Sequence, residues 1–477
     1  MIKEVDGVSV KKVQKVLLMT PQYTLFKKDV RRCVTPMGLA YLGGFLEREG
    51  YEVRILDIAN EGYDNIIKDD EEFITYGLSD EKVKEKVKEF EPDIVGVSCI
   101  FSTQAENAKH ALKLVKEVNS EILTMTGGSH PTYDLINILN EDYVDFVIIG
   151  EGELPTSQLL NGLNNGGDLS QIGGLAYKSN KNKVVNTNRQ YIENLDELAF
   201  PARHLLNMEM YFKINFPQNP YPKGKRVTQI ITSRGCSAKC VFCTTTNFWG
   251  NRYRGRSAEN VVAEIRELKE KYDIDEIQFT DDNFTLNKER AMKVLEGIKE
   301  FGLHWCAPQG VAAWALDDEL LEKMKESGCY QLTFAVESGN QQVLNNIVKK
   351  PLDLKKVNPL VRKAQELGIK VHSFAICGLP GETLENMQET YDFVKDCGFD
   401  SASFFVATPL IGSELLETCK REGCLRKGMT CNDQLFKLGN ITTSDFSAEQ
   451  VQEICARFSR QYNKNDAREK RFEKGKY

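Results

Sequence analysis

The first third of the chain alternates short apolar runs with longer amphipathic stretches. Apolar runs of strand length occupy residues 15–20, 52–58, 93–98, 122–127 and 143–149. Between them, residues 35–49, 80–90 and 106–118 repeat apolar side chains with helical spacing. Such alternation is typical of a parallel sheet that helices cover on both faces. The pattern therefore predicts an α/β domain with a doubly wound parallel sheet over residues 1–160.

A second series of apolar runs follows residue 225 with the same rhythm. Its predicted strands are residues 226–232, 276–280, 304–307, 331–336, 370–376 and 401–407. Ser257 stands where it can cap a helix whose apolar positions share one face. Six strand–helix units predict a partial (β/α)6 barrel of the TIM type over residues 226–415, because a closed barrel has eight.

The remaining segments are more polar. Residues 161–225 are predicted to be a connector, with a hairpin at 173–188 and several prolines before the barrel. Residues 416–477 are predicted to be a small, mostly helical region that ends in a basic tail from 464 to 476. A charge run of this kind is usually a solvated face.

Composition and charge exclude several classes of protein. The chain has 477 residues and a formal net charge of −7, so it lacks the basic balance that nucleic-acid binding usually requires. No signal peptide is evident at the start, and no run of about 18 apolar residues occurs. We therefore expect a cytoplasmic protein without a membrane or nucleic-acid partner.

Three cysteines gather directly after the first barrel strand. Thirteen cysteines are scattered along the chain, an odd number that does not suit a disulfide framework, but Cys236, Cys240 and Cys243 lie within eight residues. A buried helical stripe would explain the spacing, but Gly235 and the polar residues between the cysteines disfavour it. Structural zinc would need a fourth ligand from a second close pair. A four-iron cluster with one open iron is the third reading. Four later cysteines are too widely spaced to favour a second cluster: Cys419, Cys424, Cys431 and Cys455.

The spacing CxxxCxxC, with Phe242 before the last cysteine, resembles the signature of the radical S-adenosylmethionine (SAM) superfamily. The resemblance implies that Cys236, Cys240 and Cys243 hold a 4Fe-4S cluster whose open iron binds SAM. One electron, from a donor such as flavodoxin or ferredoxin, would then release a 5'-deoxyadenosyl radical. The cofactor carries this chemistry, and the protein supplies position and exclusion of side reactions.

Polar and glycine residues follow the other predicted barrel strands, where barrel chemistry takes place. Ordinary turn and capping chemistry explains any one of them about as well as ligand binding. By resemblance, the predicted SAM-binding residues are Phe242, Asp281, Asp282, Asn283, Glu337, Ser338, Gly378, Gly381 and Thr408. The resemblance implies that Asp281, Asp282 and Asn283 lie near the ammonium group of SAM. Glu337 and Ser338 would lie near its ribose, and Gly378 and Gly381 near its adenine.

Three patterns in the first domain, residues 35–42, 127–132 and 150–153, resemble the cobalamin-binding group of that superfamily, whose first domain is Rossmann-like. No GxGxxG motif supports a dinucleotide instead. The residues predicted to bind cobalamin are Tyr23, Thr24, Ser102, Thr103, Gly127, Gly128, Ser129, His130, Gly150, Glu151 and Gly152. The loop at 21–32 has no DxHxxG histidine, so we expect no cobalt ligand from it. His130 is the nearest candidate, and its simplest role is that of a turn histidine that forms a hydrogen bond with a loop or with the cobalamin tail.

The leading hypothesis is therefore a cobalamin-dependent radical SAM methyltransferase. Its substrate would be a small molecule, methylated through methylcobalamin at an unactivated carbon or a phosphinate phosphorus. A cyclase, an oxidase or a ring-rearranging enzyme would share every motif above. A methylthiotransferase would carry more cysteines than Cys33 and Cys99 before residue 236. A sensor that only binds cobalamin or SAM would not need an open iron.

Overall fold

The computed structural model describes residues 3–5, 8–10, 12–179, 182–219 and 221–464. The chain forms two compact units that divide between Phe216 and Pro217. No helix of the described residues is long and apolar enough to span a membrane.

The first unit is built on a seven-stranded sheet in the order β12-β11-β10-β9-β8-β3-β5. Five of these strands are parallel, and all five were predicted: β3 (Lys15–Thr20), β5 (Glu52–Asp57), β8 (Ile94–Ser98), β9 (Leu123–Gly127) and β10 (Phe146–Ile148). This flavodoxin-like order reverses direction between β3 and β8, where ligands of doubly wound sheets bind. The predicted α/β fold is confirmed for this unit.

The predicted hairpin belongs to this sheet. Strands β11 (Leu175–Ser179) and β12 (Asn182–Asn186) pair with each other, and β11 pairs antiparallel with β10. The segment predicted as a connector therefore contributes two strands to the first unit, because alternation alone does not show which sheet a hairpin joins. Helix α8 (Met208–Ile214) follows in the same segment.

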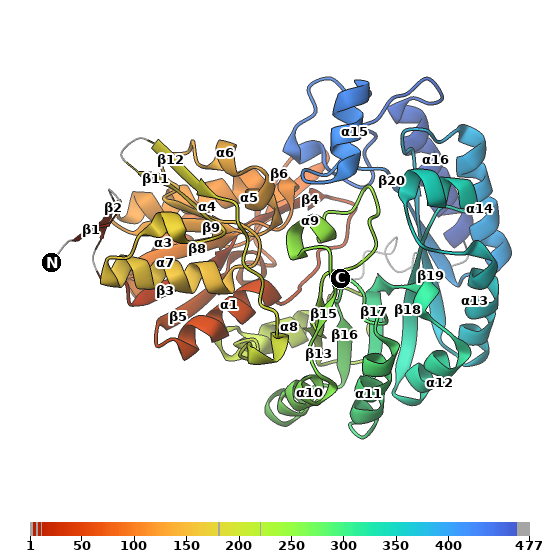
Figure 1. The fold of residues 1–477 in the computed structure, drawn as a ribbon, viewed down its shortest axis with the longest axis horizontal. Coiled ribbons are helices and arrows are strands. Elements are labelled where there is room, and N and C mark those ends of the chain that lie inside the picture. Colours follow the sequence, from red (N-terminus) through yellow and green to blue (C-terminus); the bar gives the residue numbers. More distant parts are fainter. Residues whose placement is uncertain (1–2, 6–7, 11, 180–181, 220, 465–477) are drawn as a thin grey trace. The chain divides into compact units, whose positions relative to one another are not determined.

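Helices cover both faces of the sheet (Figure 1). They include α1 (Met37–Arg48), α3 (Asp80–Phe90), α4 (Ala105–Val118) and α7 (Glu153–Asn165). Val83 and Val87 of α3 and Leu112 of α4 share one buried core with Met19 and Val97 of the sheet. The helical spacing seen in the sequence thus marks the faces that pack on the sheet.

A small antiparallel sheet stands where the sequence predicted a loop. It has the order β4-β7-β6 and consists of β4 (Tyr23–Phe26), β7 (Phe73–Tyr76) and β6 (Ile66–Asp69). Three helices of the first unit are also only four or five residues long: α2 (Ile58–Glu61), α5 (Ser129–Tyr133) and α6 (Leu135–Ile138). Strand β4 lies within the predicted loop over residues 21–32, and β6 and β7 were not predicted, because elements of four or five residues leave little periodicity to read. A two-stranded ribbon, β1 (Lys3–Val5) and β2 (Val8–Val10), lies near the start of the chain.

The second unit contains a six-stranded parallel sheet whose strands follow one another in chain order. They are β13 (Val227–Ile230), β16 (Glu276–Phe279), β17 (His304–Val311), β18 (Cys329–Glu337), β19 (Lys370–Cys377) and β20 (Ser401–Val406). Figure 1 shows the helices along its outer side: α10 (Ala258–Tyr272), α11 (Lys288–Lys299), α12 (Asp318–Glu326), α13 (Val357–Glu366) and α14 (Leu384–Cys397). The Ser257 hydroxyl caps α10 by accepting from the Asn260 amide, as predicted.

A polar plug closes the amino end of this sheet. The fully buried Glu276 carboxylate accepts from the backbone amides of Lys223 and Gly224, at 2.6 and 2.8 Å, and from the Tyr330 hydroxyl at 2.7 Å. Asn219 donates to the same Tyr330 hydroxyl at 3.0 Å. These hydrogen bonds replace those that the Glu276 carboxylate would form with water, so they offset the free-energy cost of burying it. We call these residues, Asn219, Lys223, Gly224, Glu276 and Tyr330, the amino-end plug.

The last segment, predicted to be mostly helical, contains two α-helices among its described residues. Helices α15 (Glu414–Glu422) and α16 (Ala448–Asn463) flank residues 424–447, which fold without a further α-helix. Residues 425 and 441 form an isolated antiparallel bridge within them. Most of the predicted basic tail, residues 465–476, lies outside the described residues.

Candidate functional site

The three cysteines lie on a loop that the protein clamps at its start. Strand β14 (Ser233–Arg234) pairs antiparallel with β15 (Arg254–Gly255) just before the first cysteine. Gly235 follows with a φ of +85°, and a Cβ there would come 2.3 Å from the Arg252 carbonyl oxygen. Only glycine fits this turn, which sets the direction of the cysteine loop.

Asp281, at the carboxyl end of β16, braces the start of this loop. Its Oδ1 accepts from the Thr232 amide at 3.0 Å, the Thr232 hydroxyl at 2.8 Å and the Ser233 hydroxyl at 2.5 Å. Burial raises the pKa of Asp281, and the Arg290 guanidinium opposes that rise. Asp281 Oδ1 is therefore occupied by the loop, which supports a positioning role, whereas the buried Oδ2 has no hydrogen-bond partner among the described residues. The predicted contact with the SAM ammonium stays a prediction.

The three cysteines are half-buried, and their thiols lie near enough to affect one another's ionisation. Burial, opposed by the Lys350 ammonium, is the main cause that raises the pKa of Cys240 to about 12. Burial also raises the pKa of Cys243. Because a metal binds the thiolate form, binding of metal by these two thiols must release protons. Two donors already point at sulfur: the Thr245 amide at 3.4 Å from Cys243 and the Asn283 amide at 3.9 Å from Cys236. The three sulfurs thus fit an iron–sulfur cluster.

Asp282 and Phe242 lie beside the cysteines. The Asp282 carboxylate accepts from the Thr245 hydroxyl at 3.0 Å and from the Gly235 amide at 3.3 Å. Thr245 opens the short helix α9 (Thr245–Trp249), which follows the last cysteine. Phe242 is half-buried between Val241 and Cys243. Asp282, Asn283 and Phe242 are therefore near the cluster loop, where the sequence predicted them.

Glu337 forms a buried ion pair that the sequence did not reveal. It ends β18 with a φ of +68°, which is rare for a residue with a side chain. The Lys350 ammonium lies 3.1 Å from its Oε1, and the side chains of Lys350 and Glu337 are only 6% and 8% exposed. Lys350 also lies 5.4 Å from the centre of the Trp314 ring. The π-helical turn Val343–Val348 brings Lys350 back to β18, so sequence spacing gave no signal of the pair.

Breaking this ion pair should destabilise the protein strongly. Lys350→Met leaves the Glu337 carboxylate buried without its cation, and such changes cost about 3–5 kcal/mol of the free energy of unfolding. Urea denaturation of the apoprotein measures the loss. The double variant Glu337→Gln/Lys350→Met should lose less than the sum of the single changes.

The neighbouring Lys349 provides the control. It pairs with Glu414, but both side chains are about half exposed, so Lys349→Met should change the free energy of unfolding by less than about 1 kcal/mol. Equal effects at Lys349 and Lys350 would show that the buried pair contributes no more than the exposed one.

Several predicted SAM-binding residues make contacts within the protein. The Ser338 side chain is fully buried 3.3 Å from the Thr390 hydroxyl, and the Thr408 hydroxyl donates to the Val406 carbonyl at 3.0 Å. A Cβ on Gly378 would meet the Val451 side chain of α16 at 2.6 Å. Gly378 thus allows close packing of a helix, and the predicted approach of adenine to its backbone stays a prediction. These placements support structural roles for the three residues.

The turn after β19 is held by Glu382. Its fully buried carboxylate accepts from the Gly378 and Leu379 amides at 2.9 and 2.7 Å. Burial raises the pKa of Glu382 to about 7. A Cβ on Gly381 would lie 3.3 Å from the Ile347 side chain, so this glycine is less crowded than Gly378. Gly381 stays a candidate for contact with SAM.

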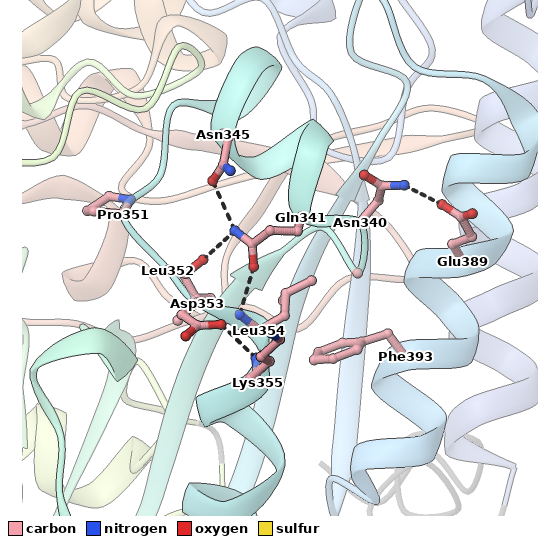
Figure 2. A pocket seen from close by; sticks show the side chains of 11 residues that line it. Asn340, Gln341, Asn345, Pro351, Leu352, Asp353, Leu354, Lys355, Glu389 and Phe393 are labelled. Carbon is pink, nitrogen blue, oxygen red and sulfur yellow. Dashed lines mark hydrogen bonds between the residues drawn. The ribbon is translucent and has the colours of Figure 1, made fainter.

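A pocket of ≈ 900 Å³ opens on the surface of the second unit, and Gly339, Leu352, Lys355 and Phe393 contribute to its lining (Figure 2). Its polar groups bind one another: Gln341 donates to Asn345 and to the Leu352 carbonyl, both at 2.9 Å. None of the cysteines contributes to it. We therefore assign it no part in the chemistry.

In the first unit, two loops meet beyond the carboxyl ends of β3 and β8. The Gln104 side chain accepts from the Thr24 amide at 2.9 Å and donates to the Thr24 carbonyl at 2.8 Å. It also donates to the Thr103 hydroxyl at 3.3 Å, while the Thr24 hydroxyl bonds that of Thr75 at 2.8 Å. Tyr23 precedes Thr24 on β4, and burial raises its pKa to about 12. Gln104, absent from the prediction, ties these loops together.

The turn after β9 packs on the turn after β8. Gly128 has a φ of +106°, and a Cβ there would lie 2.6 Å from the Cys99 carbonyl oxygen. The Cys99 backbone thus approaches closely on the Cβ side of Gly128, and the predicted approach of a ligand stays a prediction. Ser129 donates to the Ile100 carbonyl at 2.5 Å, and His130 bonds the Ser102 hydroxyl at 3.1 Å through Nδ1. Gly127 ends β9 just before this turn.

His130 is 1% exposed, and its Nε2 has no hydrogen-bond partner among the described residues. Burial lowers its pKa, so the ring is neutral at physiological pH. The bond to Ser102 supports the simple role of a turn histidine.

The turn after β10 is joined to the same region. The Gly150 amide donates to the Thr132 hydroxyl at 2.9 Å, and a Cβ on Gly150 would approach the Arg189 side chain at 3.2 Å. Glu151 is buried and accepts from the Ile192 amide at 3.4 Å. Gly152 precedes α7, and the nearest atom to its Cβ position is 4.0 Å away. Of these three, Gly152 has the most open surroundings.

An exposed apolar surface lies among these turns. Ile100 and Phe101 follow β8 and are 56% and 50% exposed, and Ile136 of α6 is 53% exposed. Large apolar side chains with this exposure are candidates for contact with a ligand. These apolar residues were not among the predicted cobalamin-binding residues, most of which carry hydroxyl groups or are glycines.

Sequence models of two families match the chain. The model of the radical SAM superfamily matches residues 230–394, and that of the B12 binding domain matches residues 24–160.

Two curated relatives align along most of the chain. Cytidylyl-2-hydroxyethylphosphonate methyltransferase of Streptomyces wedmorensis is 42% identical over 95% of this chain and 90% of its own length. An uncharacterized methyltransferase of Pyrococcus horikoshii is 33% identical over 91% of this chain and 90% of its own.

The fold is similar to that of a solved structure. The radical SAM methyltransferase TsrM of Kitasatospora setae superposes with a TM-score of 0.69 at 18% identity, over 94% of this chain and 83% of its own.

Proposed function

Because the chain belongs to the radical SAM superfamily, in the group that also carries a B12 binding domain, we propose that it methylates a carbon atom of a small molecule. The chain is a radical SAM enzyme that uses a 4Fe-4S cluster, SAM and cobalamin. Bound together, these groups supply an adenosyl radical and a transferable methyl group. An electron donor such as flavodoxin or ferredoxin and a cytoplasmic location are part of the proposal.

The observation that carries the proposal is the clamped loop with its three thiols. Gly235 and the β14–β15 pair fix its entry, and Asp281 holds the residues before it. A loop shaped in this way presents three sulfurs at the carboxyl ends of parallel strands, where barrel enzymes bind their substrates. A protein that only bound SAM would need no such set of thiols.

The protein's own residues have separate tasks in this proposal. Cys236, Cys240 and Cys243 hold the cluster, and the amide groups of Thr245 and Asn283 stabilise charge on their sulfurs. Glu337, fixed by Lys350, accepts from a ribose hydroxyl of SAM. In the first unit, Ile100, Phe101 and Ile136 cover one side of cobalamin. The proposed functional regions remain residues 1–160, 226–415 and 416–477.

We propose a nucleotide-linked phosphonate as the substrate, since the relative from Streptomyces wedmorensis is a cytidylyl-2-hydroxyethylphosphonate methyltransferase. Its 42% identity over 95% of this chain supports a related substrate. The methyl acceptor would be a carbon atom of the hydroxyethyl group, whose hydrogen atom the adenosyl radical removes.

The test is product analysis with SAM that carries a deuterated methyl group. The reconstituted holoprotein, a chemical reductant and cytidylyl-2-hydroxyethylphosphonate should yield 5'-deoxyadenosine together with a product that carries one deuterated methyl group. Mass spectrometry and NMR identify the methylated carbon. If 5'-deoxyadenosine forms and the phosphonate is cyclised or oxidised without gaining methyl, the methyltransferase proposal is wrong. If no phosphonate reacts at all, the substrate proposal is wrong.

A further inference from the structure

The strands β19 and β20 present two different faces. The outer face is packed: Phe404 of β20 lies 5.4 Å from the Phe458 ring of α16 and 5.7 Å from the Tyr391 ring of α14. Because side chains alternate along a strand, Ser403 and Phe405 point to the opposite, inner face of the sheet. Both are only half-buried, as are Phe374 and Ile376 on the same face of β19. The inner face here is therefore accessible, whereas the outer face is covered.

Four aromatic rings follow one another along this inner face. His372 lies 5.3 Å from Phe374, Phe374 lies 5.3 Å from Phe405, and Phe405 lies 5.9 Å from Phe436. Adjacent rings meet edge to face, an arrangement that fixes their orientation. The Ser401 and Ser403 hydroxyls hold the two nitrogens of His372 at 2.7 and 3.0 Å. The row is anchored at its His372 end.

Phe436 is the exposed end of the row. Its carbonyl accepts from the Val406 amide at 2.9 Å, and the Thr408 hydroxyl donates to the adjacent Leu435 carbonyl at 3.3 Å. These bonds place Phe436 at the carboxyl end of β20, the end where barrel enzymes bind substrates. Its side chain is nevertheless 49% exposed. Rigid backbone support and an exposed ring together suit stacking against a flat ligand.

We propose that Phe436, backed by Phe405, stacks on the nucleobase of the substrate. The inference rests on the proposed function, in which the substrate carries a pyrimidine nucleotide. Stacking on an aromatic side chain recognises the flat face of a base without further hydrogen bonds. The nucleotide would thus be held by residues of the last strand and of the segment after it. Phe436 is a positioning and specificity residue and takes no part in bond making.

Equilibrium binding of cytidine 5'-monophosphate to the holoprotein tests this proposal by calorimetry. The nucleotide should bind the wild-type protein, and ribose 5-phosphate, which lacks the base, should bind much more weakly. Phe436→Ala should weaken nucleotide binding by roughly 5- to 100-fold, the range that corresponds to one base–aromatic stack. Phe436→Tyr keeps the ring and should keep the affinity. With cytidylyl-2-hydroxyethylphosphonate, Phe436→Ala should raise KM and leave kcat nearly unchanged.

Phe301→Ala is the matched control, because this half-buried ring lies between α11 and β17, at the amino end of the sheet. It should leave nucleotide affinity unchanged. Lower affinity for SAM with unchanged affinity for the nucleotide in Phe436→Ala would assign the ring to adenine and overturn the proposal. Methylation of free 2-hydroxyethylphosphonate with the same KM would also overturn it, while the proposed methyltransferase function would stand.

Discussion

Replacing Cys236, Cys240 and Cys243 together by alanine should abolish the iron–sulfur cluster and the cleavage of SAM. The three thiolates are the ligands that the cluster loop supplies, and no other three cysteines of the chain are spaced so closely. Anaerobic reconstitution of the wild-type protein should give about four irons and four sulfides per chain, since three thiolates can hold a four-iron cluster. Iron and sulfide analysis and the yield of 5'-deoxyadenosine measure the loss.

The C-terminal cysteines provide the control for this experiment. Changing Cys419, Cys424 and Cys431 to serine should leave the iron content unchanged, because Cys419 and Cys424 are buried and spaced irregularly with Cys431. If the triple alanine variant still bound a full four-iron cluster, the cluster would have to be bound by other residues, and its assignment to this loop would be wrong.

Replacing Gly128 by valine should remove cobalamin from the first unit while SAM cleavage continues. The new side chain cannot fit 2.6 Å from the Cys99 carbonyl oxygen, so the turn after β9 must separate from the turn after β8. The contact between His130 and Ser102 and the surface formed by Ile100 and Phe101 depend on that approach. The visible absorption spectrum of the purified protein reports bound cobalamin. Methyl transfer should disappear, and 5'-deoxyadenosine should still form.

Gly50→Val is a control that distinguishes the effect of the steric clash at Gly128 from the effect of backbone strain. Gly50 also has a positive φ, +90°, but nothing lies within 4 Å of its Cβ position. This variant carries only the strain of a left-handed residue, about 1–2 kcal/mol, and should retain cobalamin. If Gly128→Val keeps both cobalamin and full methyl transfer, the turn that contains Gly128 is not part of the cobalamin site.

The long strands of both units were predicted from the sequence because each is rich in apolar residues and is bounded by glycine or polar residues. Residues 15–20 match β3 residue for residue, and residues 370–376 fall one residue short of β19. The small sheet of β4, β6 and β7 was missed, since its strands have four residues each and depend on tertiary pairing. All four residues of β6 are exposed, so the sequence contains no buried apolar run that would predict this strand.

The candidate site was predictable where chemistry requires several residues close together in sequence. The CxxxCxxC spacing is of this kind. Lys350 was not predictable, because it reaches Glu337 only through a π-helical turn, and Phe436 lies in a segment without periodicity. Glycines were placed correctly at turns, but sequence alone did not show whether a ligand or the protein approaches them. At Gly128 and Gly378 the protein itself occupies the space beside the Cβ position.

The amino-end plug determines where two homologous enzymes can exchange their barrels. A crossover between residues 225 and 226, at the predicted start of the barrel, would separate Glu276 from Lys223 and Gly224, whose amides it binds. In such a chimera, one enzyme would supply the buried Glu276 carboxylate and the other enzyme would supply the segment whose amides bind it. A crossover between Phe216 and Pro217 transfers Asn219, Lys223 and Gly224 together with Glu276. Residues 217–219 and 221–225 should therefore be transferred together with the barrel, although they form none of its strands.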